Sequence, residues 1–179
     1  MNNSIRIAFC GIITALGTML MFFTGLISIG TYALPAIAGV LSILIVVELG
    51  VKWAWPVYAA TSILSFLLAA DKEAAVLYFV FFGFYPILKA CMERLQKKSV
   101  VYLLKFAAFN AAMILDFFIS LSVLRVPQES FTVFGIYLPW AFLAAGNVVF
   151  IIYDFAVSGL VVMYYQRFHK TLGRLLHIK

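Results

Sequence analysis

Long apolar stretches alternate with short polar turns throughout the chain. A helix needs about 20 mainly apolar residues to cross the hydrocarbon core of a membrane. The clearest such stretch begins at the charged triplet 71–73 and ends at the basic residues Arg94, Lys97 and Lys98. The whole pattern predicts six membrane-spanning helices, over about residues 7–29, 34–49, 53–70, 74–92, 100–124 and 139–166.

The composition agrees with a membrane location. Hydrophobic residues make up 65% of the chain and charged residues 11%, whereas a soluble domain has about 45–50% and about 25%. A soluble chain of 179 residues could not bury this much apolar surface in one core. We therefore expect one all-α, six-helix membrane domain that covers residues 1–179.

The basic residues predict the orientation of the helices. With the N-terminus inside, eleven of the thirteen Lys and Arg residues fall on the inner side, and such an excess marks the cytoplasmic side. We therefore expect a multi-pass protein of the cell membrane with both termini in the cytoplasm. The net charge of +6 then reflects topology, and no nucleic-acid partner is expected. The inner set is Arg6, Lys52, Lys89, Arg94, Lys97, Lys98, Lys105, Arg167, Lys170, Arg174 and Lys179, and the outer set is Lys72 and Arg125.

The sequence contains no motif for covalent chemistry. It has no Walker-type phosphate loop, no nucleophile elbow and no HExxH. Cys10 and Cys91 both fall toward the predicted cytoplasmic side, and no metal-ligand spacing surrounds them. The sequence therefore predicts a protein that is not an enzyme and that needs no metal or cofactor.

Polar residues within the predicted spans are the candidates for function, because burying them in lipid is costly. Asp116 and Asp154 lie too deep to reach the membrane surface, so each must be protonated, paired or exposed to a wet cavity. Asn110 and Asn147 can form hydrogen bonds between helices. The sequence leaves open whether these four residues line a pocket or only join helices.

The fourth span carries two further features. Pro86 follows Tyr85 and removes a backbone donor, so a kink near Gly83 is predicted, which either lines a cavity or serves packing. Lys89 and Glu93 are four residues apart. We interpret Lys89 as a lysine that extends to the inner membrane surface.

Small residues recur on one face of the first predicted helix, at Ala8, Gly11 and Ala15. Such a face allows another helix to approach closely. The helix could pack inside the protein or against a partner subunit, and the sequence favours packing inside the protein.

Two stretches carry a resemblance to a known family. IAFCGIITALGTML resembles the alanine-rich first helix of the substrate-binding S components of energy-coupling-factor (ECF) transporters. LPAIAGVLSILIVVELGVKWA is similar to their second and third helices. The length, the six helices and the basic C-terminal tail fit the same class.

The resemblance implies an uptake subunit that binds a small molecule, such as a vitamin or precursor, near the outer side. It implies that Ala8, Gly11 and Ala15 contact a transmembrane coupling subunit, which works with two ATPase subunits. Lys72 could pair with an acidic substrate. The candidate substrate-binding residues are Lys72, Glu73, Tyr85, Asn110, Asp116 and Asn147.

Two other functions remain open. One is a structural membrane protein of cell-envelope assembly, in which Asp116 and Asp154 would only join helices. The other is a stand-alone proton-coupled carrier that uses Asp116 or Asp154. The carrier ranks last because the chain lacks an evident inverted repeat with paired broken helices.

Overall fold

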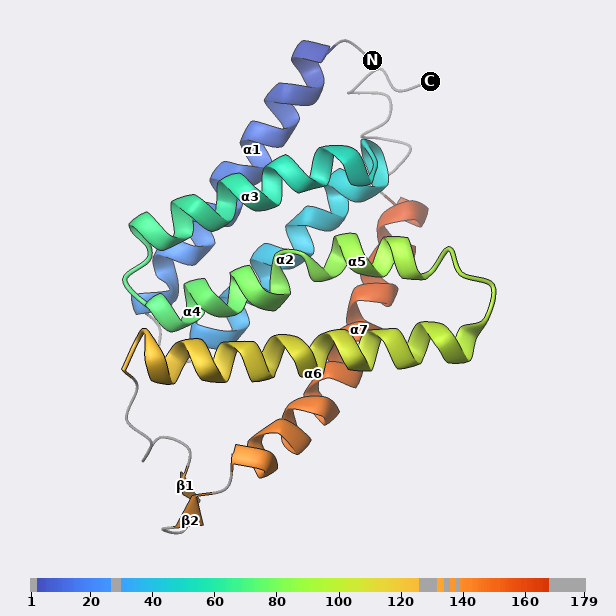
Figure 1. Cartoon of the computed structure of the whole chain (residues 1–179). Coiled ribbons are helices and arrows are strands. Elements are labelled where there is room, and N and C mark those ends of the chain that lie inside the picture. The colour runs from blue at the N-terminus through green and yellow to red at the C-terminus, as the bar shows by residue number, and fades with distance from the viewer. Residues whose placement is uncertain (1–2, 27–29, 126–131, 134–135, 138, 168–179) are drawn as a thin grey trace.

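The computed structural model describes residues 3–26, 30–125, 132–133, 136–137 and 139–167. This part of the chain is helical except for one short pair of antiparallel strands (Figure 1). The elements are α1 (Asn3–Phe22), the 3₁₀ helix η1 (Phe23–Leu26), α2 (Gly30–Glu48), α3 (Val51–Leu68), α4 (Lys72–Leu77), the π-helix η2 (Tyr78–Phe82), α5 (Tyr85–Met92), α6 (Lys98–Ser122), β1 (Thr132–Val133), β2 (Ile136–Tyr137) and α7 (Pro139–Arg167).

Six helical segments in the described residues are long and apolar enough to cross a membrane. They correspond one by one to the six predicted spans, so the fold is that of a multi-pass helical membrane protein. The end of the first predicted span, at 27–29, and the basic residues Lys170, Arg174 and Lys179 lie outside the described residues.

The helix starts that differ most from the prediction are those of α1 and α2, by four residues each. Helix α2 begins at Gly30, whereas the sequence predicted a loop up to residue 33. Pro35 lies inside α2, buried, where it removes the hydrogen bond to the Thr31 carbonyl. The Thr31 hydroxyl donates to Asp71 at 2.6 Å. This contact ties the first turn of α2 to the start of α4.

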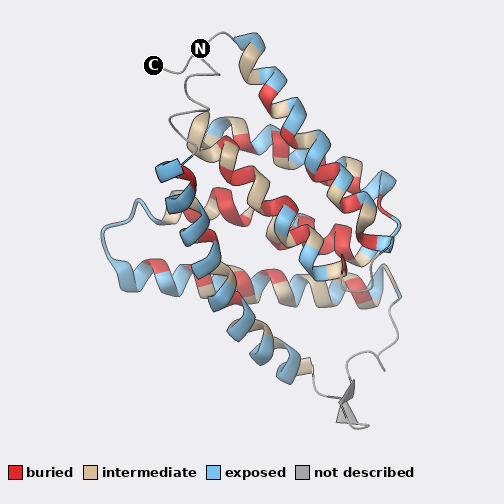
Figure 2. Cartoon of the chain, turned by 180° about the vertical axis from the view of Figure 1, so that it is seen from behind, coloured by how far each residue is buried: buried red, intermediate tan, exposed pale blue. Residues whose placement is uncertain are grey.

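Helix α2 is the centre of the bundle. It contacts α1, α3, α4, η2 and α5, whereas the main helical neighbour of α7 is α6. Buried residues are most frequent in α2 and in the fourth span (α4, η2 and α5) and least frequent in α6 and α7 (Figure 2). Large apolar side chains such as Phe118, Ile152 and Phe155 are exposed on these two helices. Such a surface is suited to contact with lipid.

The fourth span is interrupted where Pro86 predicts a break. The Gly83 N–H donates to the Tyr78 carbonyl at 2.8 Å, five residues back, as in a π-helix. The Phe79 carbonyl accepts instead from the Tyr58 hydroxyl at 2.7 Å. A hydroxyl from α3 thus satisfies a carbonyl that the irregular backbone releases.

Gly39 lets α2 approach this irregular backbone closely. A Cβ atom at Gly39 would lie 2.2 Å from the carbonyl oxygen of Phe82. That carbonyl would normally receive the N–H of residue 86, which proline lacks. The contact therefore places the polar backbone of the break against α2 and away from lipid.

Six antiparallel spans give the bundle two distinct ends. The starts of α1, α3 and α6 lie at one end with the last turns of α2, α5 and α7 (Figure 1). We call this the basic end, because Arg6, Lys52, Arg94 and Lys98 lie there. The other end contains the starts of α2, α4 and α7 and the β1–β2 pair.

We expect Gly39→Ala to lower the free energy of unfolding by about 3 kcal/mol, because the new methyl group must displace backbone. Gly11→Ala is the matched control, since nothing lies within 4 Å of a Cβ there. The control should be neutral or stabilising by less than about 1 kcal/mol, because alanine favours helix. Denaturation of both variants in detergent micelles measures the difference. Equal free energies of unfolding for the two variants would contradict the close contact between Gly39 and Phe82.

Candidate functional site

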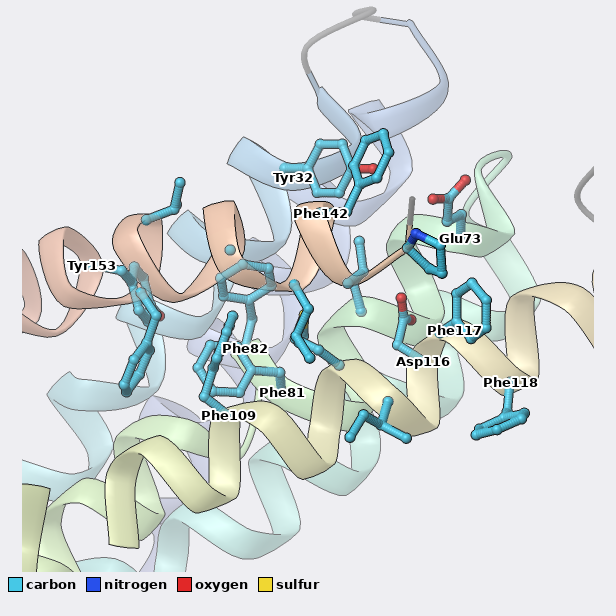
Figure 3. A pocket seen from close by; sticks show the side chains of 18 of the residues that line it. Tyr32, Glu73, Phe81, Phe82, Phe109, Asp116, Phe117, Phe118, Phe142 and Tyr153 are labelled. Carbon is cyan, nitrogen blue, oxygen red and sulfur yellow. The ribbon is translucent and has the colours of Figure 1, made fainter. Parts of the chain in front are cut away.

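A cavity of about 580 Å³ lies between α4–η2, α6 and α7, in the part of the bundle away from the basic end (Figure 3). We call the part of its lining farthest from the basic end the mouth, which consists of Tyr32 at the start of α2, Glu73 at the start of α4 and Trp140 at the start of α7. Its depth reaches Tyr153, in the middle of α7. A cavity of this size matches the sites that bind small organic molecules, which span about 300–1,000 Å³.

Aromatic side chains form most of the wall. Ten of the nineteen lining residues are Phe, Tyr or Trp. Phe109 and Phe150 stack with ring centroids 4.7 Å apart, and Phe81 meets the edge of Phe109 at 5.2 Å. The aromatic set is Tyr32, Phe81, Phe82, Phe109, Phe117, Phe118, Trp140, Phe142, Phe150 and Tyr153.

The break in the fourth span shapes this wall. Phe81 and Phe82 are consecutive residues of η2, and both line the cavity. The sequence-based candidates for function were polar residues, and they did not include these Phe side chains. The run YFVFFGFY at 78–85, just before Pro86, is the signal that could have indicated an aromatic wall at a helix break.

Two of the predicted residues, Glu73 and Asp116, line the cavity. Asp71 fixes the first turn of α4, because its carboxylate accepts the N–H groups of Glu73 and Ala74 at 3.0 and 3.1 Å. Glu73 is therefore held on a well-formed helix start. Asp116 lies within α6, and in Figure 3 its side chain points from α6 toward α7.

Two polar atoms of the cavity residues have no hydrogen-bond partner among the described residues. One is Oδ1 of Asp116 and the other is the hydroxyl of Tyr153, and both atoms are buried. Buried polar groups in proteins nearly always have a partner, which is a protein group, water or a ligand. These two atoms therefore favour a polar occupant of the cavity.

The other predicted residues lie elsewhere. Lys72 donates to the carbonyls of Phe66 and Ala69 at 2.7 and 2.9 Å, so it caps the end of α3. Asn110 and Asn147 bond to each other at 2.9 and 3.0 Å and join α6 to α7. These three side chains are not among the residues that line the cavity.

Tyr85 belongs to a buried ionic cluster nearer the basic end. Its hydroxyl donates to Asp154 at 2.6 Å. Asp154 also accepts from Lys89 at 2.5 Å and from Lys105 at 3.0 Å. The cluster joins α5, α6 and α7, so the pairing that the sequence left open for Asp154 is observed.

Lys89 does not extend to the membrane surface, and that interpretation was wrong. The residue is only 3% exposed, and its ammonium group is enclosed by Asp154, Ser158 and Glu93. These three acceptor groups match the three N–H donors of the ammonium group. A lysine at the membrane surface would bond to water and would not need them. The i,i+4 contact with Glu93 is present at 2.7 Å, as one part of this larger cluster.

Glu93 completes the cluster just beyond the fourth span. Lys105 donates to it at 2.8 Å. Burial tends to raise the pKa of the Glu93 carboxyl, but hydrogen bonds from Lys105 and Lys89 outweigh burial, so its pKa lies below the ordinary value. Two lysines thus face two carboxylates, and the cluster is balanced in charge.

The small residues of α1 face outward. Ala8, Gly11 and Ala15 are all exposed, whereas the buried face of the helix carries Phe9, Ile13 and other residues. The expectation that the small face packs inside the protein is therefore wrong. Helix α3 packs instead against the neighbouring face, where Gly17 lies close to Thr61.

Within the described ranges, no group of three or more His, Cys, Asp or Glu side chains could hold a metal ion. Comparison of the chain with protein-family models, with curated proteins and with solved structures gave no match. The geometry therefore defines a class, a multi-pass helical membrane protein with an aromatic cavity at one end and a buried ionic cluster toward the other.

We expect Asp154→Asn to lower the free energy of unfolding by about 3–5 kcal/mol, because it leaves two buried lysines with one shared carboxylate. Glu93→Gln removes the same charge from a side chain that is 47% exposed, and should cost less than about 1 kcal/mol. Denaturation in detergent micelles compares the two variants. A smaller loss for Asp154→Asn than for Glu93→Gln would contradict the assigned cluster.

Proposed function

We propose that this protein is the substrate-binding subunit of an ECF-type uptake transporter for a small molecule. The observation that carries the proposal is the aromatic cavity at one end of the bundle, with its two unpartnered buried polar atoms. A protein that only joins other membrane helices has no need of such a cavity, since well-packed interiors leave few voids larger than a water molecule.

The proposed orientation places the cavity mouth outside the cell. Most of the described Lys and Arg residues lie at or toward the basic end, and the positive-inside rule assigns such an end to the cytoplasm. An even number of spans then puts both chain ends in the cytoplasm. Substrate enters from outside, between the starts of α4 and α7.

The proposal also requires partners, because the sequence has no Walker-type phosphate loop. A coupling subunit and two ATPase subunits would supply the energy. The outward face of α1 supports such a contact. Nothing lies within 4 Å of a Cβ at Gly11, so a partner helix has room to approach the backbone there.

The proton-coupled carrier is the second candidate, and Asp116 is the observation that favours it. An unpaired carboxylate oxygen in a membrane cavity can bind and release a proton. Uptake by the purified chain alone in liposomes, abolished by Asp116→Asn, would favour the carrier over the subunit.

Mass spectrometry after gentle detergent extraction tests whether the cavity holds a small molecule. Wild type should retain a small molecule, and Val149→Trp should lose it, because Val149 lines the cavity and a larger ring would fill it. Val148→Trp is the control, since Val148 is similarly exposed, at 60% against 64%, and is not among the lining residues. Equal retention by the two variants would overturn the assignment of the cavity.

The partner contact is tested in the same extracts. Gly11→Leu should reduce co-purification of other subunits at least tenfold while the bound small molecule is retained. Gly159→Leu on α7 is the control, because nothing lies within 4 Å of a Cβ there either. If wild type co-purifies with no other subunit, the uptake-subunit proposal fails.

A further inference from the structure

We propose that the ligand of this cavity is an organic cation with an apolar body. The inference rests on the proposed function, since it assigns a substrate class to the same cavity. Its basis is the charge of the lining residues, the partners of the nearby lysines and the aromatic wall.

The charged residues that line the cavity are acidic. Glu73 and Asp116 both line the cavity, and no Lys, Arg or His is among its described lining residues. A site that binds an anion in a membrane needs cationic or N–H donors close to it. Two carboxylates would repel such a ligand, whereas they attract a cation.

The lysines near the cavity are already engaged. Lys72, which the sequence assigned to an acidic substrate, donates to two backbone carbonyls at the end of α3. Lys89 and Lys105 are held by Asp154 and Glu93, nearer the basic end. None of the three provides a positive charge to the cavity, so its two carboxylates are not neutralised from within by these lysines.

Asp116 has the environment of a counter-ion that lacks its partner. Its Oδ1 atom is buried and accepts no hydrogen bond from the described residues. Its neighbours in the lining include Phe117 on α6 and Phe142 on α7. Any ammonium group in the cavity would supply the missing charge, and one that carries an N–H would also donate the missing hydrogen bond.

The aromatic wall fits the same ligand. The face of an aromatic ring carries negative charge density and attracts a cation within about 6 Å of its centre. Tyr32 and Phe142 lie on the side of the cavity where Glu73 and Asp116 lie (Figure 3), and Trp140 also lines the cavity. The deeper wall, with Phe81, Phe109 and others, is apolar and suits the body of the ligand. Aromatic rings with a carboxylate are a common way of binding ammonium groups.

Three probes of matched size separate the ligand classes. They are benzyltrimethylammonium, its neutral analogue with carbon in place of nitrogen, and the anion benzylphosphonate. Each is titrated calorimetrically into the purified full chain in detergent micelles. The same titration into Val149→Trp, in which the new ring fills the cavity, measures the heat that comes from partitioning of the probe into the micelle.

The cation should bind saturably, at least tenfold more tightly than the neutral analogue, and the anion should not saturate. Tighter binding of the neutral or anionic probe would overturn the inference but leave the cavity as a ligand site, so the proposed function would stand. No saturable binding of any probe would overturn the inference and count against the proposed function as well.

Substitutions of the cavity carboxylates identify which charge binds the cation. Asp116→Asn should weaken binding of benzyltrimethylammonium at least tenfold and leave the neutral analogue within twofold. Glu93→Gln is the matched control, since it removes one carboxylate charge from an exposed side chain that does not line the cavity. If Asp116→Asn does not fold, Glu73→Gln tests the cavity charge independently. Unchanged cation binding in both cavity variants, or an equal loss in Glu93→Gln, would contradict the assignment.

Discussion

The pairing of two buried lysines with Asp154 is the interaction on which the arrangement of the last three spans depends. An unpaired ammonium group is costly in a low-dielectric interior, so α5, α6 and α7 must stay together where Lys89 and Lys105 lie. Helix α7 has few other buried residues. Tyr153, the neighbour of Asp154, lines the deep end of the cavity, so the ionic cluster also sets the position of the cavity wall.

The two polar regions of the bundle therefore have different chemistry. In the ionic cluster every charge faces an opposite charge, which is typical of a structural element. In the cavity the carboxylates of Glu73 and Asp116 lie among aromatic rings with no cation in the described lining. The reciprocal hydrogen bonds of Asn110 and Asn147 join α6 to α7 between these regions. Of these two regions as the described residues form them, the cavity is the one left incomplete in charge and hydrogen bonding, and this contrast supports its assignment as the ligand site.

The sequence predicted the spans well, because lipid imposes a length and an apolar composition that can be read locally. It also located the break before Pro86, since proline acts through its own backbone. It could not predict which polar groups meet, because Lys89 and Asp154 are 65 residues apart and their contact depends on helix rotation. The sequence named both Asn110 and Asp116 as candidate substrate-binding residues, whereas in the fold Asn110 bonds to Asn147 and only Asp116 lines the cavity.

The central claim is that the cavity opens to the outside while the basic end faces the cytoplasm. Cysteine labelling in intact cells tests it most directly, in a chain whose Cys10 and Cys91 are replaced by alanine. Trp140→Cys at the cavity mouth should react with a membrane-impermeant maleimide from outside. Lys98→Cys at the start of α6 should react only after the membrane is permeabilised. The reverse pattern would contradict the account.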